Sequence, residues 1–457
     1  MNKIVTSNRR RFGRIKWSNE VDYLSGQSVE TLWLTRFIFL YFWLLIFEGS
    51  LRKWVLPGLA APLLVIRDPV AVVIVFLGIR RRLLGQNPYV MVMAALAAAF
   101  CLLGLFQTVS GVKWTVVVYG LRTYFLHLPL IFVIGMGLPV DATRRLCRYI
   151  CITAIAMTPL IVLQFFSPPG SLINIAIGGG EQIAAAGDKI RPPGTFSYIL
   201  GVVYFYSCAF AIALAAELQK NLIKPWLARA TLVACMLTVA ISGSRTLVTS
   251  IGIVFVLFLA SVIINRRFLG RSAFILTLMV VAIIGLFGLS VFREGISSLN
   301  TRFVDAGDTE GGSMGFLTRI STFVTEGFDA MKDCPLLGHG LGMGTNVGSQ
   351  LITNGLDFLL AEGEWPRVVL EAGPAMGFIY LLYRVVLTGN IAYKTFKLVR
   401  VGVVAPFLMW GACASNLLFG QWGAPSNQGF AVFVAGLSIA FMRHEIAPTR
   451  SRLPFNN

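Results

Sequence analysis

Long apolar stretches alternate with short polar connections over most of the chain. The apolar stretches are continuous, as in VYFYSCAFAIALAAE at 203–217. A helix needs about 20 apolar residues to cross a hydrocarbon layer of ~30 Å, whereas a transmembrane β-barrel would show alternating segments of about ten residues. The pattern therefore predicts an all-α, polytopic integral membrane protein with about 12 transmembrane helices, at 32–48, 60–79, 88–107, 115–136, 148–166, 197–216, 228–243, 246–264, 272–291, 374–390, 402–420 and 427–442.

The composition agrees with a membrane protein. Of the 457 residues, 56% are hydrophobic and 13% are charged, whereas soluble domains carry about 25% charged residues. The formal net charge of +18 would by itself also fit a nucleic-acid-binding protein. The basic residues lie in the connections between apolar runs, however, where they suit anionic lipid and the cytoplasm, and no nucleic-acid-binding motif is present. We therefore expect the lipid bilayer, and no nucleic acid, as a partner.

The distribution of positive charge predicts the orientation. The two tails and alternate connections between spans hold 24 of the 39 Lys and Arg residues. By the positive-inside rule these segments are cytoplasmic, and an even number of spans places both termini there. The predicted divisions are a cytoplasmic N-terminal tail at 1–31, nine spans within 32–291, a large outer loop at 292–373, three spans within 374–442, and a cytoplasmic C-terminal tail at 443–457.

The loop at 292–373 is the one large hydrophilic block, with 11 of the 21 acidic residues. Its segment FLTRISTFVTEGFDAMKD has apolar residues at helical spacing, so we expect a small helical cap on the membrane domain. The next segment, DCPLLGHGLGMGTNVG at 333–348, contains five glycines and His339. Pro335 can end the preceding helix, and Gly338, Gly340 and Gly342 allow turns and close backbone approach. The alternative is a flexible turn without a ligand.

Four arginines lie inside predicted spans: Arg36, Arg67, Arg122 and Arg384. A charge within the membrane is costly and usually faces a cavity or a partner. Arg67 and the adjacent Asp68 can neutralise each other or mark a helix end, and Arg384 can extend its side chain to the surface. We expect Arg122 to face a water-filled outer cavity, and we expect His127 to make a helix–helix contact.

Three further arginines lie at the outer ends of predicted elements: Arg191 in KIRPPGTFSY, Arg245 in ISGSRTLVTS, and Arg319 in the cap helix. Arginine binds phosphate oxygens in a bidentate manner through its planar guanidinium group. Together with Arg122, these residues are candidates for a pyrophosphate site. The alternative for each is an independent surface salt bridge. The seven cysteines are scattered, without Cys/His metal-ligand spacing, so we expect no disulfide, metal or other cofactor.

An arginine-led amphipathic helix in a late outer loop, followed by Pro-Leu-hydrophobic-Gly-x-Gly-hydrophobic-Gly, resembles the O-antigen ligase/O-antigen polymerase (Wzy-like) superfamily. The residues that carry the resemblance are Arg319 to Met331, PLLGHGLG at 335–342 and AEGEWPRVVLEAGPAMGF at 361–378, with RPPGTF at 191–196 and SGSRT at 242–246. Ligases of this family usually show His-Asn about ten residues before Glu-x-Gly. This chain has Glu362-Gly363 there, which favours a polymerase-type member.

The resemblance implies a metal-independent glycosyltransferase in the bacterial cell inner membrane that acts on its periplasmic side, in O-antigen, lipopolysaccharide or exopolysaccharide assembly. The donor would be a polyprenyl-pyrophosphate-linked oligosaccharide and the acceptor a saccharide, with a chain-length regulator as a further possible partner. Direct displacement would invert the anomeric carbon. An acidic residue would act as the base: Glu362 is the first candidate, then Glu364, then His339.

Two other functions fit parts of the sequence. A transporter or flippase of a lipid-linked or anionic substrate would explain arginines within spans, but it would not require the acidic, glycine-containing cap. A membrane scaffold without a site would tolerate alanine at Arg122, Arg245 and Arg319 together.

Overall fold

A computed structural model describes residues 29–446 except 86, 178–183, 187–188, 311–314, 333 and 354–359, and leaves out the side chains of 184–186, 302, 305–310, 315–320 and 445–446. The fold is almost wholly helical, which confirms the predicted class. The helices of the membrane domain are α1 (Val29–Ser50), α3 (Arg67–Arg80), α4 (Pro88–Val109), α5 (Trp114–Leu121), α6 (Leu130–Gly137), α7 (Val140–Phe166), α8 (Ile199–Leu218), α9 (Pro225–Ile241), α10 (Arg245–Ile264), α11 (Leu269–Phe287), α16 (Pro374–Val399), α17 (Ala405–Phe419) and α18 (Pro425–Ile446).

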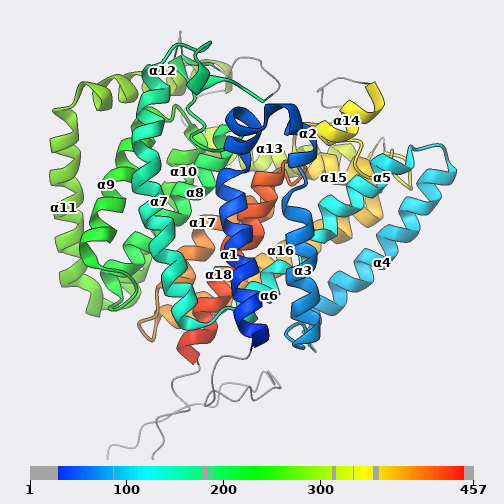
Figure 1. The fold of residues 1–457 in the computed structure, drawn as a ribbon, viewed down its shortest axis with the longest axis horizontal. Helices are drawn as coiled ribbons and strands as arrows, with labels where there is room; N and C mark the ends of the chain where they lie inside the picture. Colours follow the sequence, from blue (N-terminus) through cyan, green and yellow to red (C-terminus); the bar gives the residue numbers. More distant parts are fainter. Residues whose placement is uncertain are drawn as a thin grey trace, which may run out of the picture.

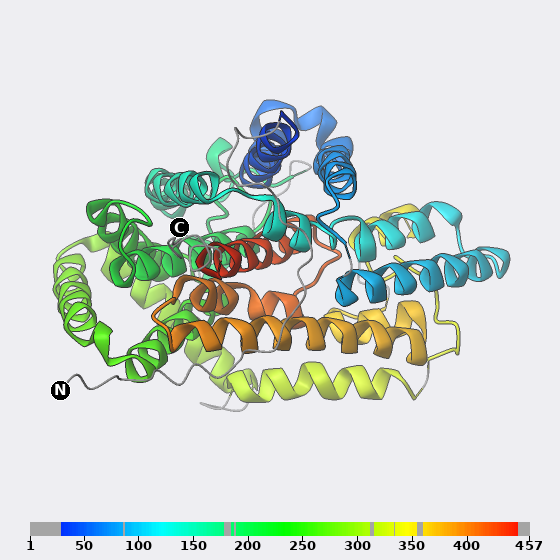
Figure 2. The ribbon, with the colours of Figure 1, turned by 90° about the horizontal axis from the view of Figure 1, so that it is seen from below.

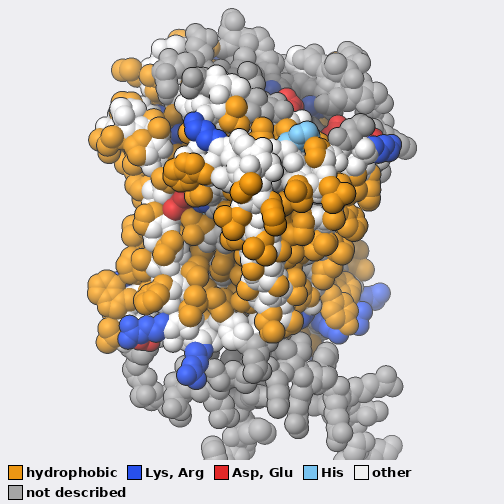
Figure 3. Space-filling view, turned by 90° about the vertical axis from the view of Figure 1, so that its right-hand side faces the viewer, with side chains coloured by type: hydrophobic (Ala, Val, Ile, Leu, Met, Phe, Trp, Pro, Cys, Tyr) orange, Lys and Arg blue, Asp and Glu red, His pale blue; other side chains and the backbone are white. Residues whose placement is uncertain are grey.

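Each of the predicted spans coincides with a helix or a pair of helices. Among the described residues, nine segments are long and apolar enough to cross a membrane, and α9 and α17 are shorter apolar helices. With α18 these account for all the predicted ranges. Figure 3 shows one face of the molecule, on which hydrophobic side chains form a broad band with Lys and Arg side chains beyond it. The chain is therefore a multi-pass membrane protein.

The second and fourth predicted spans are interrupted. A π-helical turn (η1, Leu51–Val55), a 3₁₀ turn (η2, Pro57–Leu59) and the short α2 (Ala60–Leu63) connect α1 to α3. A second π-helical turn (η3, Arg122–Leu126) separates α5 from α6, just before Pro129, which has no N–H to continue the helix. Interrupted helices occur within a membrane only where protein or water satisfies the freed backbone groups, so both breaks mark polar regions of the bundle.

The two ends of the bundle differ (Figure 1). One end, called the loop end below, carries the helices between α11 and α16: α12 (Ser290–Glu310), α13 (Gly315–Ala330), α14 (Asn346–Thr353) and α15 (Glu364–Ala372). The first described turn of α1 and the last turn of α18 lie together at the other end, called the termini end. Helix α13 confirms the predicted cap helix.

The loop end also contains a small antiparallel hairpin of β1 (Ala184–Ala186) and β2 (Lys189–Ile190), which the sequence did not indicate. Short 3₁₀ turns lie at η4 (Leu172–Asn174) and η5 (Arg266–Phe268). Helices α8, α17 and α18 occupy the centre of the bundle, and α4 and α11 lie at opposite sides (Figures 1 and 2). The connection between α17 and α18 reaches the loop end beneath α15, where it helps to form the candidate site.

Candidate active site

The glycine-rich segment packs directly against two helices. Gly338, Gly340 and Gly342 all have positive φ angles, of 71°, 140° and 85°, which side-chain-bearing residues rarely adopt. A Cβ at Gly338 would overlap the backbone carbonyl of Glu371 in α15, and one at Gly342 would overlap the carbonyl of Val116 in α5. The close approach expected from the sequence is therefore present, but at Gly338 and Gly342 the neighbour is the protein's own backbone. Pro335 follows the end of α13 and is exposed.

Gln107 of α4 fixes this segment in place. Its side-chain amide donates to the carbonyls of Leu337, at 2.5 Å, and Glu371, at 2.9 Å. Its carbonyl oxygen accepts a 2.8 Å hydrogen bond from the N–H of Leu341. Buried backbone groups must find partners, and one side chain here satisfies three of them. This role of Gln107 could not be predicted from the sequence, because a single glutamine near the end of an apolar run gives no spacing signal.

Glu371 is a second anchor, from α15. Its carboxylate accepts hydrogen bonds from the Gly344 N–H, at 2.9 Å, and the Tyr124 hydroxyl, at 2.7 Å. It also forms an ion pair of 2.9 Å with Arg367. The side chain is fully buried. The glutamate of the Glu-x-Gly sequence therefore holds the glycine-rich segment, η3 and α15 together.

Glu364 is enclosed by two arginines. One of its oxygens lies 2.5 Å from Arg384 and the other 3.0 Å from Arg367, and this second oxygen also accepts from the N–H of Trp422 at 3.1 Å. The residue is 1% exposed and both of its carboxylate oxygens are held in ion pairs, so it is not placed to accept a proton from an acceptor hydroxyl. The interpretation of Arg384 as extending to the membrane surface is wrong, since the side chain is 2% exposed and points to Glu364.

These four residues form a buried row of alternating charge: Arg384, Glu364, Arg367 and Glu371. Burial lowers the pKa of Arg367, but the neighbouring carboxylates of Glu364 and Glu371 outweigh that effect and raise it well above its ordinary value. The guanidinium group is therefore charged at every accessible pH. Two positive and two negative charges cancel, as buried ion pairs must to be tolerated.

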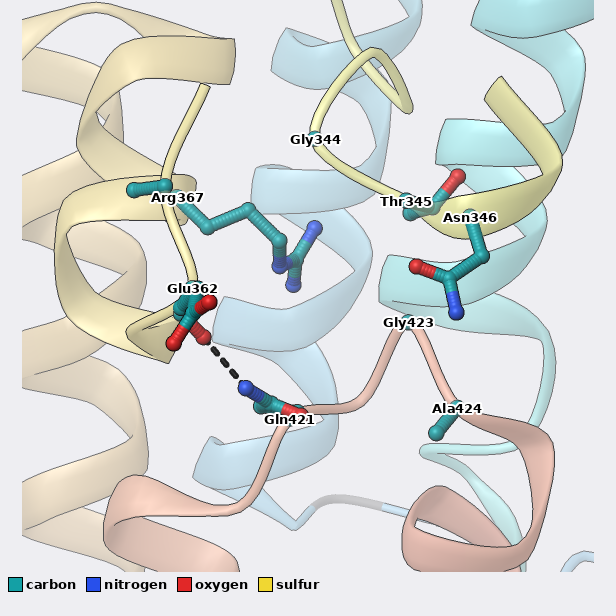
Figure 4. A pocket seen from close by; sticks show the side chains of 9 residues that line it. Gly344, Thr345, Asn346, Glu362, Arg367, Gln421, Gly423 and Ala424 are labelled. Carbon is teal, nitrogen blue, oxygen red and sulfur yellow. Dashed lines mark hydrogen bonds between the residues drawn. The ribbon is translucent and has the colours of Figure 1, made fainter. Parts of the chain in front are cut away.

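A small pocket that is partly open to solvent lies beside this row. Figure 4 shows Thr345 and Asn346 on one side of it, Glu362 and Gln421 on the other, and the guanidinium group of Arg367 between them. Gln421 donates a hydrogen bond to the backbone carbonyl of Glu362 and so links the α17–α18 connection to the start of α15. The pocket is lined by Gly344, Thr345, Asn346, Ala361, Glu362, Arg367, Gln421, Gly423 and Ala424.

Of the three predicted bases, only Glu362 lines this pocket. Its side chain is exposed, whereas the carboxylate of Glu364 is buried behind it in the row of alternating charge. His339 is exposed in the glycine-rich segment and donates its backbone N–H to the carbonyl of Leu370 at 2.7 Å. Within the described part of the chain, no group of three or more His, Cys, Asp or Glu residues is placed to hold a metal ion.

Arg122 lies at the break between α5 and α6 and is paired with Asp68. Its Nε and Nη2 donate to the two carboxylate oxygens of Asp68 at 2.8 and 2.7 Å. His127 hydrogen-bonds to the same carboxylate and to Tyr41, at 3.0 Å each. Arg122 thus faces a carboxylate partner, where a water-filled cavity was expected. The helix–helix contact expected for His127 is confirmed. Arg67 pairs with Glu48 rather than with Asp68, at 2.9 Å.

The other three predicted arginines belong to separate elements. Arg191 follows β2, and its buried Nε has no hydrogen-bond partner among the described residues. Arg245 begins α10, directly after Ser244, which caps the helix by accepting from the Leu247 N–H at 3.3 Å. Arg319 lies in α13, and its side chain is outside the described residues. The pocket lining includes neither Arg191 nor Arg245.

Comparison with known proteins identifies part of the chain. Residues 230–366 match the family model of the O-antigen ligases. This range contains Arg245, Arg319, the glycine-rich segment, Glu362 and Glu364, but not Arg191 or Glu371. A comparison with curated proteins finds no match. The resemblance noted in the sequence is confirmed over this range, which is similar to the O-antigen ligases of the O-antigen ligase/polymerase superfamily.

Proposed function

We propose that this protein is an inverting glycosyltransferase of the polymerase type that transfers a polyprenyl-pyrophosphate-linked oligosaccharide to a saccharide acceptor. The transfer takes place on the periplasmic side of the bacterial inner membrane, with both termini in the cytoplasm. The observation that carries the proposal is the position of Glu362, an exposed carboxylate that shares a pocket with the glycine-rich segment, in the range that matches the O-antigen ligases.

Glu362 is the proposed general base. The acceptor hydroxyl gives its proton to this carboxylate. The oxygen of the hydroxyl then forms a bond to the anomeric carbon of the donor. The bond from that carbon to the phosphate oxygen breaks, and the lipid pyrophosphate leaves with the electron pair. Amide groups from Asn346 and Gln421 in the lining of this pocket can orient the sugar.

The departing pyrophosphate needs positive charge placed where its own charge develops. Arg191, Arg245 and Arg319 remain the proposed binding residues, each at the loop end or in the cap. Arg122 contributes less by itself, since Asp68 already neutralises it; its Nη1 is its one buried donor without a hydrogen-bond partner among the described residues. Glu364 supports Glu362 by holding the start of α15 rather than by accepting the proton.

The test compares Glu362→Gln with Glu326→Gln in purified protein supplied with lipid-linked oligosaccharide. Glu326 is a matched control, because it is an exposed glutamate on α13 near Gly363 and does not line the pocket. We expect the wild type and Glu326→Gln to lengthen the chain and release lipid pyrophosphate, and Glu362→Gln to lose at least about 100-fold in rate, the lower end of general-base contributions. Movement of substrate across vesicles without a covalent product would instead identify a transporter.

A further inference from the structure

A second buried cluster lies at the loop end of α1, and Arg67 is the one member of it that the sequence indicated. The Lys53 cluster, as we call it, consists of Arg52, Lys53, Arg67 and Glu48. The carboxylate of Glu48 lies 2.9 Å from Arg67 and 3.4 Å from Arg52. Lys53 has no carboxylate within ion-pair distance among the described residues. Three positive charges therefore share one negative charge.

Lys53 is the least compensated member of this cluster. It is 4% exposed, and its ammonium group donates to the carbonyl of Gly194 at 3.2 Å. The ring of Trp54 lies 4.6 Å away. An ammonium group has three donors, so two remain without a hydrogen-bond partner among the described residues. The Nη1 of Arg67 is likewise buried and without such a partner.

The segment 191–197 lies over this cluster, where Gly194 accepts from Lys53 and Ser197 accepts from Arg52. The Thr195 hydroxyl donates to the carbonyl of Ile46 at 2.8 Å, and the Ser50 hydroxyl donates to the carbonyl of Thr195 at 3.1 Å. The absence of a side chain at Gly49 permits this contact, because a Cβ there would overlap the backbone of Phe196. Arg191, with its unpartnered Nε, begins the same segment.

Uncompensated buried cations are costly, so they are normally paired or bind an anion. When Lys53 is protonated, the surplus of the Lys53 cluster is two positive charges within the described residues. A diphosphate diester carries one negative charge on each phosphoryl group, which matches this surplus. Its oxygens can accept from ammonium and guanidinium donors that approach from different sides.

The Glu362 pocket has the opposite charge. The row from Arg384 to Glu371 is neutral as a whole, and the carboxylate of Glu362 adds a negative charge to the pocket. An anion would be repelled there and attracted to the end of α1. The two charge environments therefore favour different ligand groups.

We propose that Lys53, with Arg52, Arg67 and Arg191, binds a diphosphate group at the loop end of α1. The proposed function supplies only the source of that group, the lipid-linked donor. The anion site itself stands on the buried charge surplus and on the unpartnered donors. Lys53 is then a binding residue at the rim of the membrane domain, distinct from the Glu362 pocket.

The experiment measures binding to full-length purified protein, without turnover, by thermal unfolding and titration calorimetry. The probes are inorganic pyrophosphate, orthophosphate and farnesyl diphosphate. We expect Lys53→Met to weaken binding of pyrophosphate at least tenfold and Lys53→Arg to retain it. Lys113→Met is the matched control, since Lys113 also donates to a carbonyl near the loop end, that of Leu351 at 3.0 Å, but is exposed. It should bind as the wild type does.

Stability without ligand separates binding from a structural role. If Lys53 is an anion ligand, Lys53→Met removes an uncompensated charge, and the unliganded variant should unfold at the same temperature as the wild type or a higher one. The carbonyl of Gly194 keeps its hydrogen bond from Gln164, at 3.2 Å. A lower unfolding temperature together with unchanged pyrophosphate binding would overturn the proposal, and so would absence of binding to the wild type.

Two further measurements identify the source of the anion and test the anion site independently of the proposed function. Tighter binding of farnesyl diphosphate than of pyrophosphate supports the lipid-linked donor as the source, whereas equal affinity supports a site for the free anion. Glu362→Gln should bind pyrophosphate normally. If that variant retains full transfer while Lys53→Met still loses binding, Glu362 is not the base but the anion site stands.

Discussion

The backbone N–H of Gly344 donates a 2.9 Å hydrogen bond to the carboxylate of Glu371, which is buried in α15. Gly344 lines the Glu362 pocket, whereas Glu371 lies behind it in the row of alternating charge. The contact therefore fixes one wall of the proposed acceptor site against the buried row of ion pairs. It also explains why the glycine-rich segment and the Glu-x-Gly sequence occur together.

Replacing Glu371 with Gln should destabilise the protein. The amide keeps the volume but removes the negative charge next to Arg367, and breaking a buried pair in this way costs about 3 kcal/mol or more. The glutamine amide also has one acceptor oxygen instead of two, so it cannot accept from both the Gly344 N–H and the Tyr124 hydroxyl. We expect a lower unfolding temperature in detergent and reduced transfer activity, measured on the same preparation.

The control for this change is the exposed pair of Lys332 and Asp329, whose 2.7 Å contact is open to solvent. Asp329→Asn should change stability by less than about 1 kcal/mol, because surface ion pairs contribute little. Equal stability of Glu371→Gln and Asp329→Asn would show that the buried row does not hold the segment.

Gly342→Ala should disrupt the same region through the backbone. Gly342 has φ of 85°, and an added Cβ would overlap the carbonyl of Val116. The unfavourable left-handed conformation alone costs about 1–2 kcal/mol, and the overlap also forces the segment away from α5. We expect a lower unfolding temperature and faster proteolytic cleavage near residue 342, read by mass spectrometry.

Gly285→Ala provides the comparison, since Gly285 lies in α11 with open space around its Cβ position. Alanine is favoured over glycine in a helix interior by about 1 kcal/mol. This variant should be at least as stable as the wild type. If Gly342→Ala behaves in the same way, the segment is not held against α5 as described.

The membrane helices were predictable because the information is local. Any run of about 20 apolar residues satisfies the length of the bilayer, whatever its neighbours are. The cap helix α13 was predictable for the same reason, from the spacing of its apolar residues. The ion pairs Glu364–Arg367 and Arg367–Glu371 could also have been found, because their spacing of three and four residues places them on one helix face.

The pairing between helices was not predictable from one sequence. Arg122 meets Asp68 and Arg384 meets Glu364 because of the tilt and rotation of separate helices, which packing against neighbours sets. The sequence analysis identified the charges within the membrane but not their partners. It also assigned a catalytic role to Glu364, although the buried position of this residue depends on α16, a different element.

Gln107→Leu tests whether the glycine-rich segment depends on α4. Leucine has a similar size but cannot form hydrogen bonds, so the Leu337 carbonyl and the Leu341 N–H lose their partner. The Glu371 carbonyl keeps the hydrogen bond from the Gly340 N–H at 3.3 Å. Each buried unsatisfied group costs about 1–3 kcal/mol. We expect a marked fall in unfolding temperature and slower transfer, while Gln219→Leu, which breaks a single bond to the Ala405 N–H, should have a smaller effect.

Cys334 reports both the orientation of the loop end and the local environment of its thiol. Burial raises the pKa of Cys334 above its ordinary value, so less thiolate is present at neutral pH and alkylation is slow. In a variant that retains only this cysteine, a membrane-impermeant maleimide should label intact cells. The rate should still rise with pH beyond about 8.5, the pKa of a free thiol. A variant that retains only Cys101, which is exposed on the membrane helix α4, should stay unlabelled. Labelling of Cys334 only after permeabilisation would place the loop end in the cytoplasm and contradict the proposed function.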